Sequence, residues 1–212
     1  MAGFLTRLRG RPAAEALPPP EAPEPPPPPP SVWISFHAEV NPTTSEALLS
    51  VIAQQLNEGR KDIHLMLTTP GGVVANGLGI YNTLRALPIT LTTYNVGSVN
   101  SIGNIIYLAG EKRCASRSSS FMFHGVGFDI MGRTRFEERI LLEHLDAIRT
   151  DQRLLAAIIA ERTGIGPEEA EGLFLRQAFV ASDEAKARGI VHEVCDISVP
   201  EGVPFLQLVF QR

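Results

Sequence analysis

The 212-residue sequence has few cysteines and no cysteine motif. Its two cysteines, Cys114 and Cys195, lack the CxxC or Cys/His spacing that is typical of zinc sites. Two cysteines also do not indicate a disulfide framework, which belongs to oxidising compartments. We therefore expect no metal site, no stapling disulfide and a reducing, cytoplasmic location.

The sequence also lacks an excess of basic residues and a long apolar run. Its 19 lysines and arginines are outnumbered by 23 acidic residues, and the formal net charge is -4. This balance offers no basic surface for nucleic acid. No apolar run approaches the roughly 20 residues that cross a bilayer, and the opening MAGFLTRLRGRPAA lacks the apolar segment of a secretory signal. We expect neither nucleic acid nor a membrane as a partner.

Proline is abundant, but mostly in one place. Residues 12–30 hold 11 of the 17 prolines and end in the run Pro25–Pro30. Proline removes backbone donors and favours extended polyproline II geometry, so this segment has little capacity to form a core. We interpret residues 1–30 as a disordered proline-rich tail that acts as a stiff spacer, in preference to a docking ligand for a proline-binding partner.

Short apolar runs alternate with amphipathic segments from Ser31 onward, which is the pattern of β-α units around a largely parallel sheet. We therefore predict an α/β fold and one domain over residues 31–212. A helix of unusual length is expected over residues 134–162, where apolar residues recur at helical spacing. The expected strands are residues 32–36, 62–69, 89–96, 121–124, 179–182 and 190–194, and further helices are expected at 44–57 and 73–86, near 167 and through 187.

Three features that can carry chemistry follow expected strands, at the edge where open α/β sheets place their sites. Ser101 lies between a strand and a helix, His124 ends the run SSFMFH, and Gly72 belongs to a Pro-Gly-Gly corner. A serine nucleophile needs a base for its proton and backbone donors for the oxyanion. The amides of Gly72 and Ile102 are suited to that second task. Each feature alone also fits a structural role, since Ser101 could cap a helix and His124 could end a strand.

Four segments taken in order resemble the proteolytic subunit of the ATP-dependent Clp protease, the ClpP family, within a wider clan that includes the crotonases. The resemblance spans about Val32–Val194. The segments are TTPGGVVANGLGIYNTLRAL (Thr68–Leu87), VGSVNSIGNIIYLAGEKR (Val96–Arg113), FMFHG (Phe121–Gly125) and, from Glu161 to Val194, ERTG followed by FVASDEAKARGIVHEV.

The resemblance implies a role for each candidate residue. Ser101 would be the nucleophile, His124 the general base, and the amides of Gly72 and Ile102 the oxyanion hole, with no cofactor. The substrate would be a peptide or an unfolded protein. The fold would be a ClpP/crotonase-like spiral of β-α units, whose long helix forms a handle between two stacked heptameric rings, so we expect a homo-oligomer.

This chain departs from the family pattern at two places. The family has an acid two residues before the Phe of its F-(L/M)-S strand, and Gln177 stands there. The Gln177 amide can hold the imidazole of His124 but adds no negative charge. Asp183 could take the place of the expected acid only if the backbone shifts, and it also fits the N-cap of a helix. The proline-rich tail stands where the family has its pore-lining segment. The sequence therefore does not decide whether an ATP-dependent unfoldase is a partner.

Three functions follow from these residues. The first is a serine endopeptidase that forms an acyl-enzyme at Ser101, with activity reduced by the missing acid. The second is a catalytically weak or inactive structural subunit of a ClpP-like ring, which Gln177 motivates. The third is crotonase-type acyl-CoA chemistry, which uses paired backbone amides without a serine nucleophile.

Overall fold

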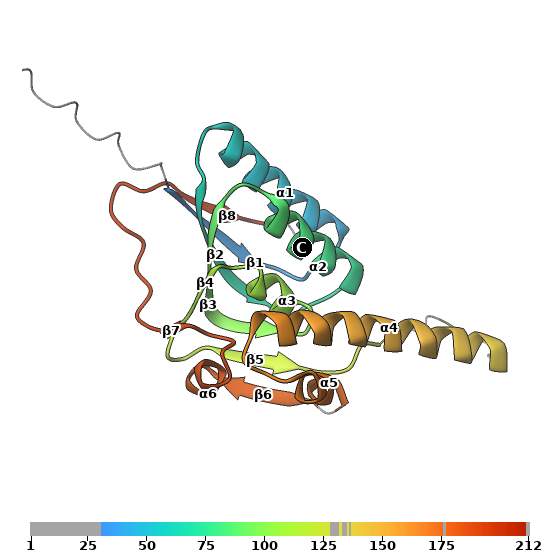
Figure 1. Cartoon of the computed structure of the whole chain (residues 1–212). Helices are drawn as coiled ribbons and strands as arrows, with labels where there is room; N and C mark the ends of the chain where they lie inside the picture. The colour runs from blue at the N-terminus through green and yellow to red at the C-terminus, as the bar shows by residue number, and fades with distance from the viewer. Residues whose placement is uncertain (1–30, 128–131, 133–134, 136, 176, 211–212) are drawn as a thin grey trace, which may run out of the picture.

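The computed structural model describes residues 31–127, 132, 135, 137–175 and 177–210 (Figure 1). The tail expected at residues 1–30 lies outside this part. The elements are β1 (Ser31–His37), α1 (Pro42–Asn57), β2 (Asp62–Thr69), α2 (Val74–Ala86), β3 (Thr90–Asn100), α3 (Gly103–Leu108), β4 (Lys112–Ala115), β5 (Ser120–Phe123), α4 (Glu138–Arg162), α5 (Pro167–Leu175), β6 (Ala178–Ala181), α6 (Ser182–Ala187), β7 (Glu193–Val194) and β8 (Phe205–Leu208).

A single eight-stranded sheet organises these elements. The strand order is β6-β5-β3-β2-β1-β8, and β4 branches from β3 to pair with β7. All pairings are parallel except that between β5 and β6. The predicted α/β fold with a largely parallel sheet is therefore confirmed.

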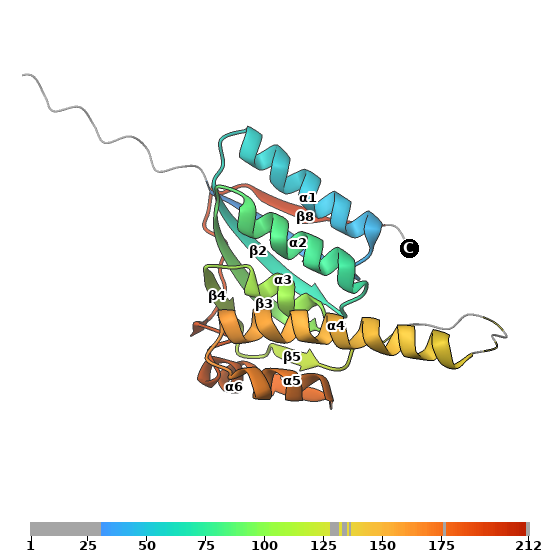
Figure 2. The ribbon, with the colours of Figure 1, turned by 45° about the vertical axis from the view of Figure 1, so that its right-hand side comes forward.

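Both faces of the central strands are covered. Helices α1 and α2 lie side by side over one face, with α3 next to them (Figures 1 and 2). On the other side, Trp33 and Tyr94 are buried in a second cluster, against which Ile197 and Val199 of the C-terminal segment pack. Coverage of both faces explains why five consecutive residues of β1, Val32–Phe36, are buried in place of every second one.

Helix α4 is buried only toward its C-terminal end. Its buried residues are Leu155, Ala156 and Ile159. The N-terminal half extends beyond the sheet in both views (Figures 1 and 2). Leu141 and Leu142, in that half, are about half exposed. The amphipathic pattern therefore predicted the helix and its end at Arg162, whereas the helix begins at Glu138 and residues 134 and 136 of the expected range lie outside the described residues. The domain itself covers only part of the apolar stripe.

The C-terminal end of the sheet differs from the sequence-based expectation. The last expected strand, residues 190–194, shortens to the two residues of β7, and the sequence analysis missed β8 altogether. Strand β8 forms the edge of the sheet and pairs in parallel with β1, with Phe205 opposite Trp33. Such edge pairing depends on a partner about 170 positions away in the sequence, which local pattern does not reveal.

A buried arginine joins three segments of the fold. The Arg113 guanidinium is almost fully buried and donates hydrogen bonds to the carbonyls of Gly110, Arg162, Gly189 and Ile190. Burial lowers the pKa of Arg113 to about 10, and the nearby Arg162 charge adds to this effect. At neutral pH the side chain still carries its charge, which the four carbonyl dipoles stabilise in place of a carboxylate.

Replacing Arg113 with methionine is expected to destabilise the fold by about 3 kcal/mol, because it leaves buried carbonyls without a donor. Urea unfolding followed by circular dichroism measures this loss. The matched control is Arg149→Met on the exposed face of α4, whose weak ion pair with Asp146 predicts a change below about 0.5 kcal/mol. Equal stability of the two variants would mean that the hydrogen bonds of the buried Arg113 guanidinium do not stabilise the fold.

Candidate active site

Ser101 occupies a strained turn between β3 and α3. Among the described residues it is the one non-glycine with positive φ, at 55°. A left-handed backbone costs a residue with a side chain of order 1 kcal/mol or more, and such strain concentrates at functional sites. Strand, strained serine and helix follow one another as in the nucleophile elbow of hydrolases. The sharp turn presents the Ser101 side chain at the strand end.

The alternative interpretation of Ser101 as a helix cap is wrong. The N-cap position of α3 is Ile102, and no side-chain hydrogen bond caps this helix. The Ser101 carbonyl accepts from the backbone and side chain of Asn104, so the backbone forms the turn and the hydroxyl is not used for it.

The positive φ predicts an unusual order of stability for two variants. Ser101→Gly should be more stable than Ser101→Ala by about 1 kcal/mol, because glycine adopts this backbone without strain. Ser35, in the regularly paired strand β1, provides the matched control, since there the glycine variant should be the less stable. Urea unfolding of the four variants tests both signs, and the same order at both positions would contradict a strained Ser101.

Strand β5 places His124 beside this turn. The backbone N–H of Ser101 donates to the Met122 carbonyl at 2.7 Å, and His124 follows two residues later. The buried Asn104 side chain donates to the same Met122 carbonyl at 2.8 Å and to the Ser101 carbonyl at 3.0 Å. Asn104 was not predicted from the sequence, although an amide side chain inside the apolar helix GNIIYL indicates a buried hydrogen-bonding role. These bonds lock the serine turn to the strand that carries the histidine.

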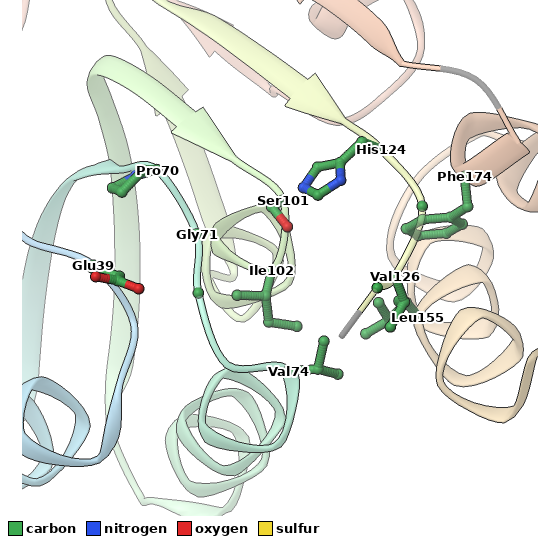
Figure 3. A pocket seen from close by; sticks show the side chains of 13 residues that line it. Glu39, Pro70, Gly71, Val74, Ser101, Ile102, His124, Val126, Leu155 and Phe174 are labelled. Carbon is green, nitrogen blue, oxygen red and sulfur yellow. The ribbon is translucent and has the colours of Figure 1, made fainter. Parts of the chain in front are cut away.

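Ser101 and His124 line the same cavity, of about 600 Å³. Figure 3 shows the imidazole facing the Ser101 side chain across a short gap. Ser101 is half-buried and His124 is exposed. Within the described chain the two side chains are not hydrogen-bonded to one another. Catalytic hydrogen bonds are often loose before substrate binds, so this geometry is compatible with proton transfer.

The Pro-Gly-Gly corner packs tightly against two neighbours. A Cβ on Gly71 would lie 2.5 Å from the Cβ of Ser101, and a Cβ on Gly72 would lie 2.1 Å from the Val40 carbonyl oxygen. Their φ angles, 97° and 145°, also favour glycine. Both positions therefore require glycine for backbone conformation and for close approach.

Two backbone amides beside Ser101 are free to bind a ligand. A bridge fixes the corner, since Val40 N–H donates to the Gly71 carbonyl and Val73 N–H to the Val40 carbonyl, each at 2.7 Å. In the described part of the chain, the N–H groups of Gly72 and Ile102 donate no hydrogen bond. Unpaired amides at a cavity wall are costly unless water or a ligand accepts from them.

Gln177 lies at the position that the antiparallel pairing brings opposite His124. Phe123 pairs with Ala178, so continuing the β5–β6 register by one residue sets Gln177 against His124. The Gln177 side chain is exposed. No hydrogen bond joins it to the imidazole in the described structure. The extended register therefore sets the two backbones opposite one another, without a hydrogen bond between their side chains.

Asp183 lies at the end of the β5–β6 pair that is remote from His124. Ser120, at the start of β5, pairs with Ala181 and lies about 13 Å along the strand from His124. Asp183 lies two residues beyond Ala181, further still from His124. It is also not the cap suggested from sequence, because the N-cap of α6 is Ala181 and Asp183 belongs to the first turn. Asp183 therefore lies too far along the sheet from His124 to contact its imidazole.

Other reactive groups are poorly placed. Burial, followed by the nearby Cys195, raises the pKa of the Cys114 thiol to about 11, so this cysteine stays protonated and unreactive.

In the described ranges, no three His, Cys, Asp or Glu side chains gather as a metal site. Over the same ranges, none of the helices has the length and apolarity needed to span a bilayer. In the described lining of the cavity, the side chains that carry a hydroxyl or an ionisable group are those of Ser101, His124 and Glu39.

Known proteins share the sequence pattern and the fold of this chain. A family model described as Clp protease matches residues 31–198. A solved structure of a ClpP1 mutant from Listeria monocytogenes matches with a TM-score of 0.70, at 23% sequence identity, over 78% of this chain and 91% of that chain. At that identity the structural match shows a shared ClpP fold, while the family model matches most of the sequence. The chain belongs to the Clp protease family.

Proposed function

We propose that this protein is a ClpP-like serine endopeptidase subunit acting on peptides or unfolded proteins. The observation that carries the proposal is the convergence of the Ser101 hydroxyl, the His124 imidazole and two unbonded amides on one cavity. This is the minimum set for acyl transfer, namely a nucleophile, a base and an oxyanion hole. The Clp protease family assignment favours the same activity over crotonase chemistry.

Each group has one task in the reaction. The Ser101 Oγ forms a bond to the scissile carbonyl carbon while His124 takes the hydroxyl proton. The carbonyl oxygen, now negative, accepts hydrogen bonds from the amides of Gly72 and Ile102. The C–N bond then breaks and His124 returns the proton to the leaving amine. Water, deprotonated by His124, hydrolyses the acyl-enzyme and restores the Ser101 hydroxyl.

The third position lowers the expected rate. As Ser101 attacks, His124 gains positive charge, and a neighbouring carboxylate would stabilise it. Gln177 is neutral, so it can at best orient the ring by accepting an imidazole N–H. In a Ser-His-Asp triad, an amide in place of the acid lowers turnover by about 10⁴, although Cys-His-Asn enzymes work with an amide. We therefore expect slow but serine-dependent hydrolysis.

Hydrolysis of fluorogenic peptides by the full-length protein tests this proposal. We expect turnover in the wild type and a loss of at least about 10³-fold in both Ser101→Ala and His124→Ala. Ser98→Ala, three residues before the nucleophile, is the control and should keep wild-type turnover. Turnover that survives in Ser101→Ala would contradict a serine mechanism.

One observation favours a second candidate, a structural subunit that does not cut. Gln177 is exposed and unbonded to His124, so the described conformation has no group that orients the imidazole. Such a subunit would assemble normally but show the same negligible turnover in wild type and Ser101→Ala. The hydrolysis measurement therefore separates the two candidates.

We also propose that the chain forms a homo-oligomer through α4. Leu141, Leu142, Leu145 and Leu154 are each between 38% and 52% exposed on this helix. An apolar stripe of this kind on a protruding helix indicates a covered surface in the assembled protein. Sedimentation at micromolar concentration should show an oligomer that Leu141→Glu/Leu145→Glu dissociates. A monomeric wild type would contradict this part of the proposal.

A further inference from the structure

The catalytic cavity has one fixed charge in its described lining, the carboxylate of Glu39. His124 is the only other ionisable side chain among those residues. Glu39 is exposed and lies beyond the end of β1, next to the Pro-Gly-Gly corner (Figure 3). The sequence analysis did not single out this residue, because a lone glutamate after a strand has no distinctive signal.

The backbone holds Glu39 rigidly beside the oxyanion amides. The Thr44 hydroxyl donates to the Glu39 carbonyl at 2.6 Å. The following residue, Val40, exchanges two hydrogen bonds of 2.7 Å with Gly71 and Val73. Because the backbone is fixed, only the side chain of Glu39 can adapt to a ligand. The Glu39 carboxylate is therefore restricted to the region beside the Pro-Gly-Gly corner.

No cation neutralises this carboxylate within the described chain. Glu39 takes part in no ion pair there, and it borders two further cavities that adjoin the catalytic one, of about 590 and 450 Å³. The described linings of all three cavities contain two carboxylates, Glu39 and Asp151, and neither lysine nor arginine. The field in this region is therefore favourable to a cation.

The opposite wall of the catalytic cavity is apolar. Val126, Leu155 and Phe174 line it. Figure 3 shows them on one side of Ser101 and Glu39 on the other. A peptide whose carbonyl carbon reaches Ser101 therefore extends toward an apolar wall in one direction and toward a carboxylate in the other.

We propose that Glu39 is a specificity-determining residue that selects peptides carrying a lysine or arginine across the scissile bond from an apolar residue. This inference rests on the proposed function of the same site. The Glu39 carboxylate and the basic side chain of the peptide would meet at a solvent-accessible position. The preference for a basic over a neutral side chain should therefore be modest, about three- to fivefold in Kd. It should weaken as salt is raised, because exposed charges are screened.

Peptide binding to a non-cutting protein tests the selectivity apart from catalysis. In the full-length Ser101→Ala background, fluorescence anisotropy compares end-capped peptides that hold one leucine and one lysine, glutamine or glutamate, placed two residues before or two residues after the leucine. The added variants are Glu39→Gln and Glu39→Lys, with Glu46→Gln as control. Glu46 is exposed on α1, borders none of the described cavities and gives the same change of net charge.

The expected result is tighter binding of the lysine peptide in one of the two placements. That preference should vanish in Glu39→Gln, reverse toward a glutamate peptide in Glu39→Lys, and persist in Glu46→Gln. Equal binding of lysine and glutamine peptides, no binding of either, or a preference that survives Glu39→Gln would overturn the inference. Because these proteins lack the nucleophile, such a failure is independent of whether Ser101 cuts peptides.

Discussion

Replacing Gln177 with aspartate is expected to raise peptidase turnover by about 10² to 10⁴. The antiparallel register sets residue 177 opposite His124, so a carboxylate there would lie beside the imidazole as it gains charge. The stabilisation would act mainly in the transition state, so kcat should rise while KM changes little. Steady-state kinetics on fluorogenic peptides measures both constants.

Two controls separate this effect from a general gain of negative charge. Gln207→Asp makes the same substitution at an exposed position of β8 and should leave turnover unchanged. Asp183→Asn removes the acid at the far end of β6 and should also leave turnover unchanged. Unaltered turnover in Gln177→Asp would mean that position 177 does not reach the imidazole, and would favour the structural-subunit candidate.

Replacing Gly72 with alanine is expected to lower turnover by about 10² to 10³. The new Cβ would lie 2.1 Å from the Val40 carbonyl oxygen, in a backbone conformation with φ of 145°. The corner must therefore move away from Val40, and the Gly72 amide moves with it. Loss of one aligned oxyanion donor then appears in kcat, measured well below the melting temperature of the variant.

Gly79→Ala is the matched control for Gly72→Ala. Gly79 belongs to α2, where an added Cβ meets no atom within 4 Å. The variant should keep wild-type turnover and gain roughly 1 kcal/mol of stability, because alanine favours a helix over glycine. If Gly72→Ala also kept wild-type turnover, its amide could not be part of the oxyanion hole.

The sequence predicted the fold where the pattern is local. The strand over residues 62–69 and the helices over 44–57 and 73–86 agree with the structure to within two residues, because each is a complete apolar repeat with its own ends. Strand β8 was missed because its only partner is the distant edge of β1. Pairing between remote segments is a property of the whole fold, which no short window contains.

The site was predicted in part, for a similar reason. Ser101, His124 and the Pro-Gly-Gly corner each end a strand, so a parallel sheet brings them to one edge. The sequence could not show that Ser101 has positive φ, that Asn104 ties it to Met122, or that Glu39 borders the cavity. These depend on how the backbone turns and on which loop lies over the edge, and both follow from packing.

Covalent labelling at Ser101 tests whether a base-activated serine faces a carbonyl-binding site. The assembled full-length protein is treated with a fluorophosphonate and the modified residue is located by tandem mass spectrometry. We expect a single adduct on Ser101, strongly reduced in His124→Ala and absent in Ser101→Ala. An adduct on another residue, or none on the assembled wild type after prolonged exposure, would contradict it.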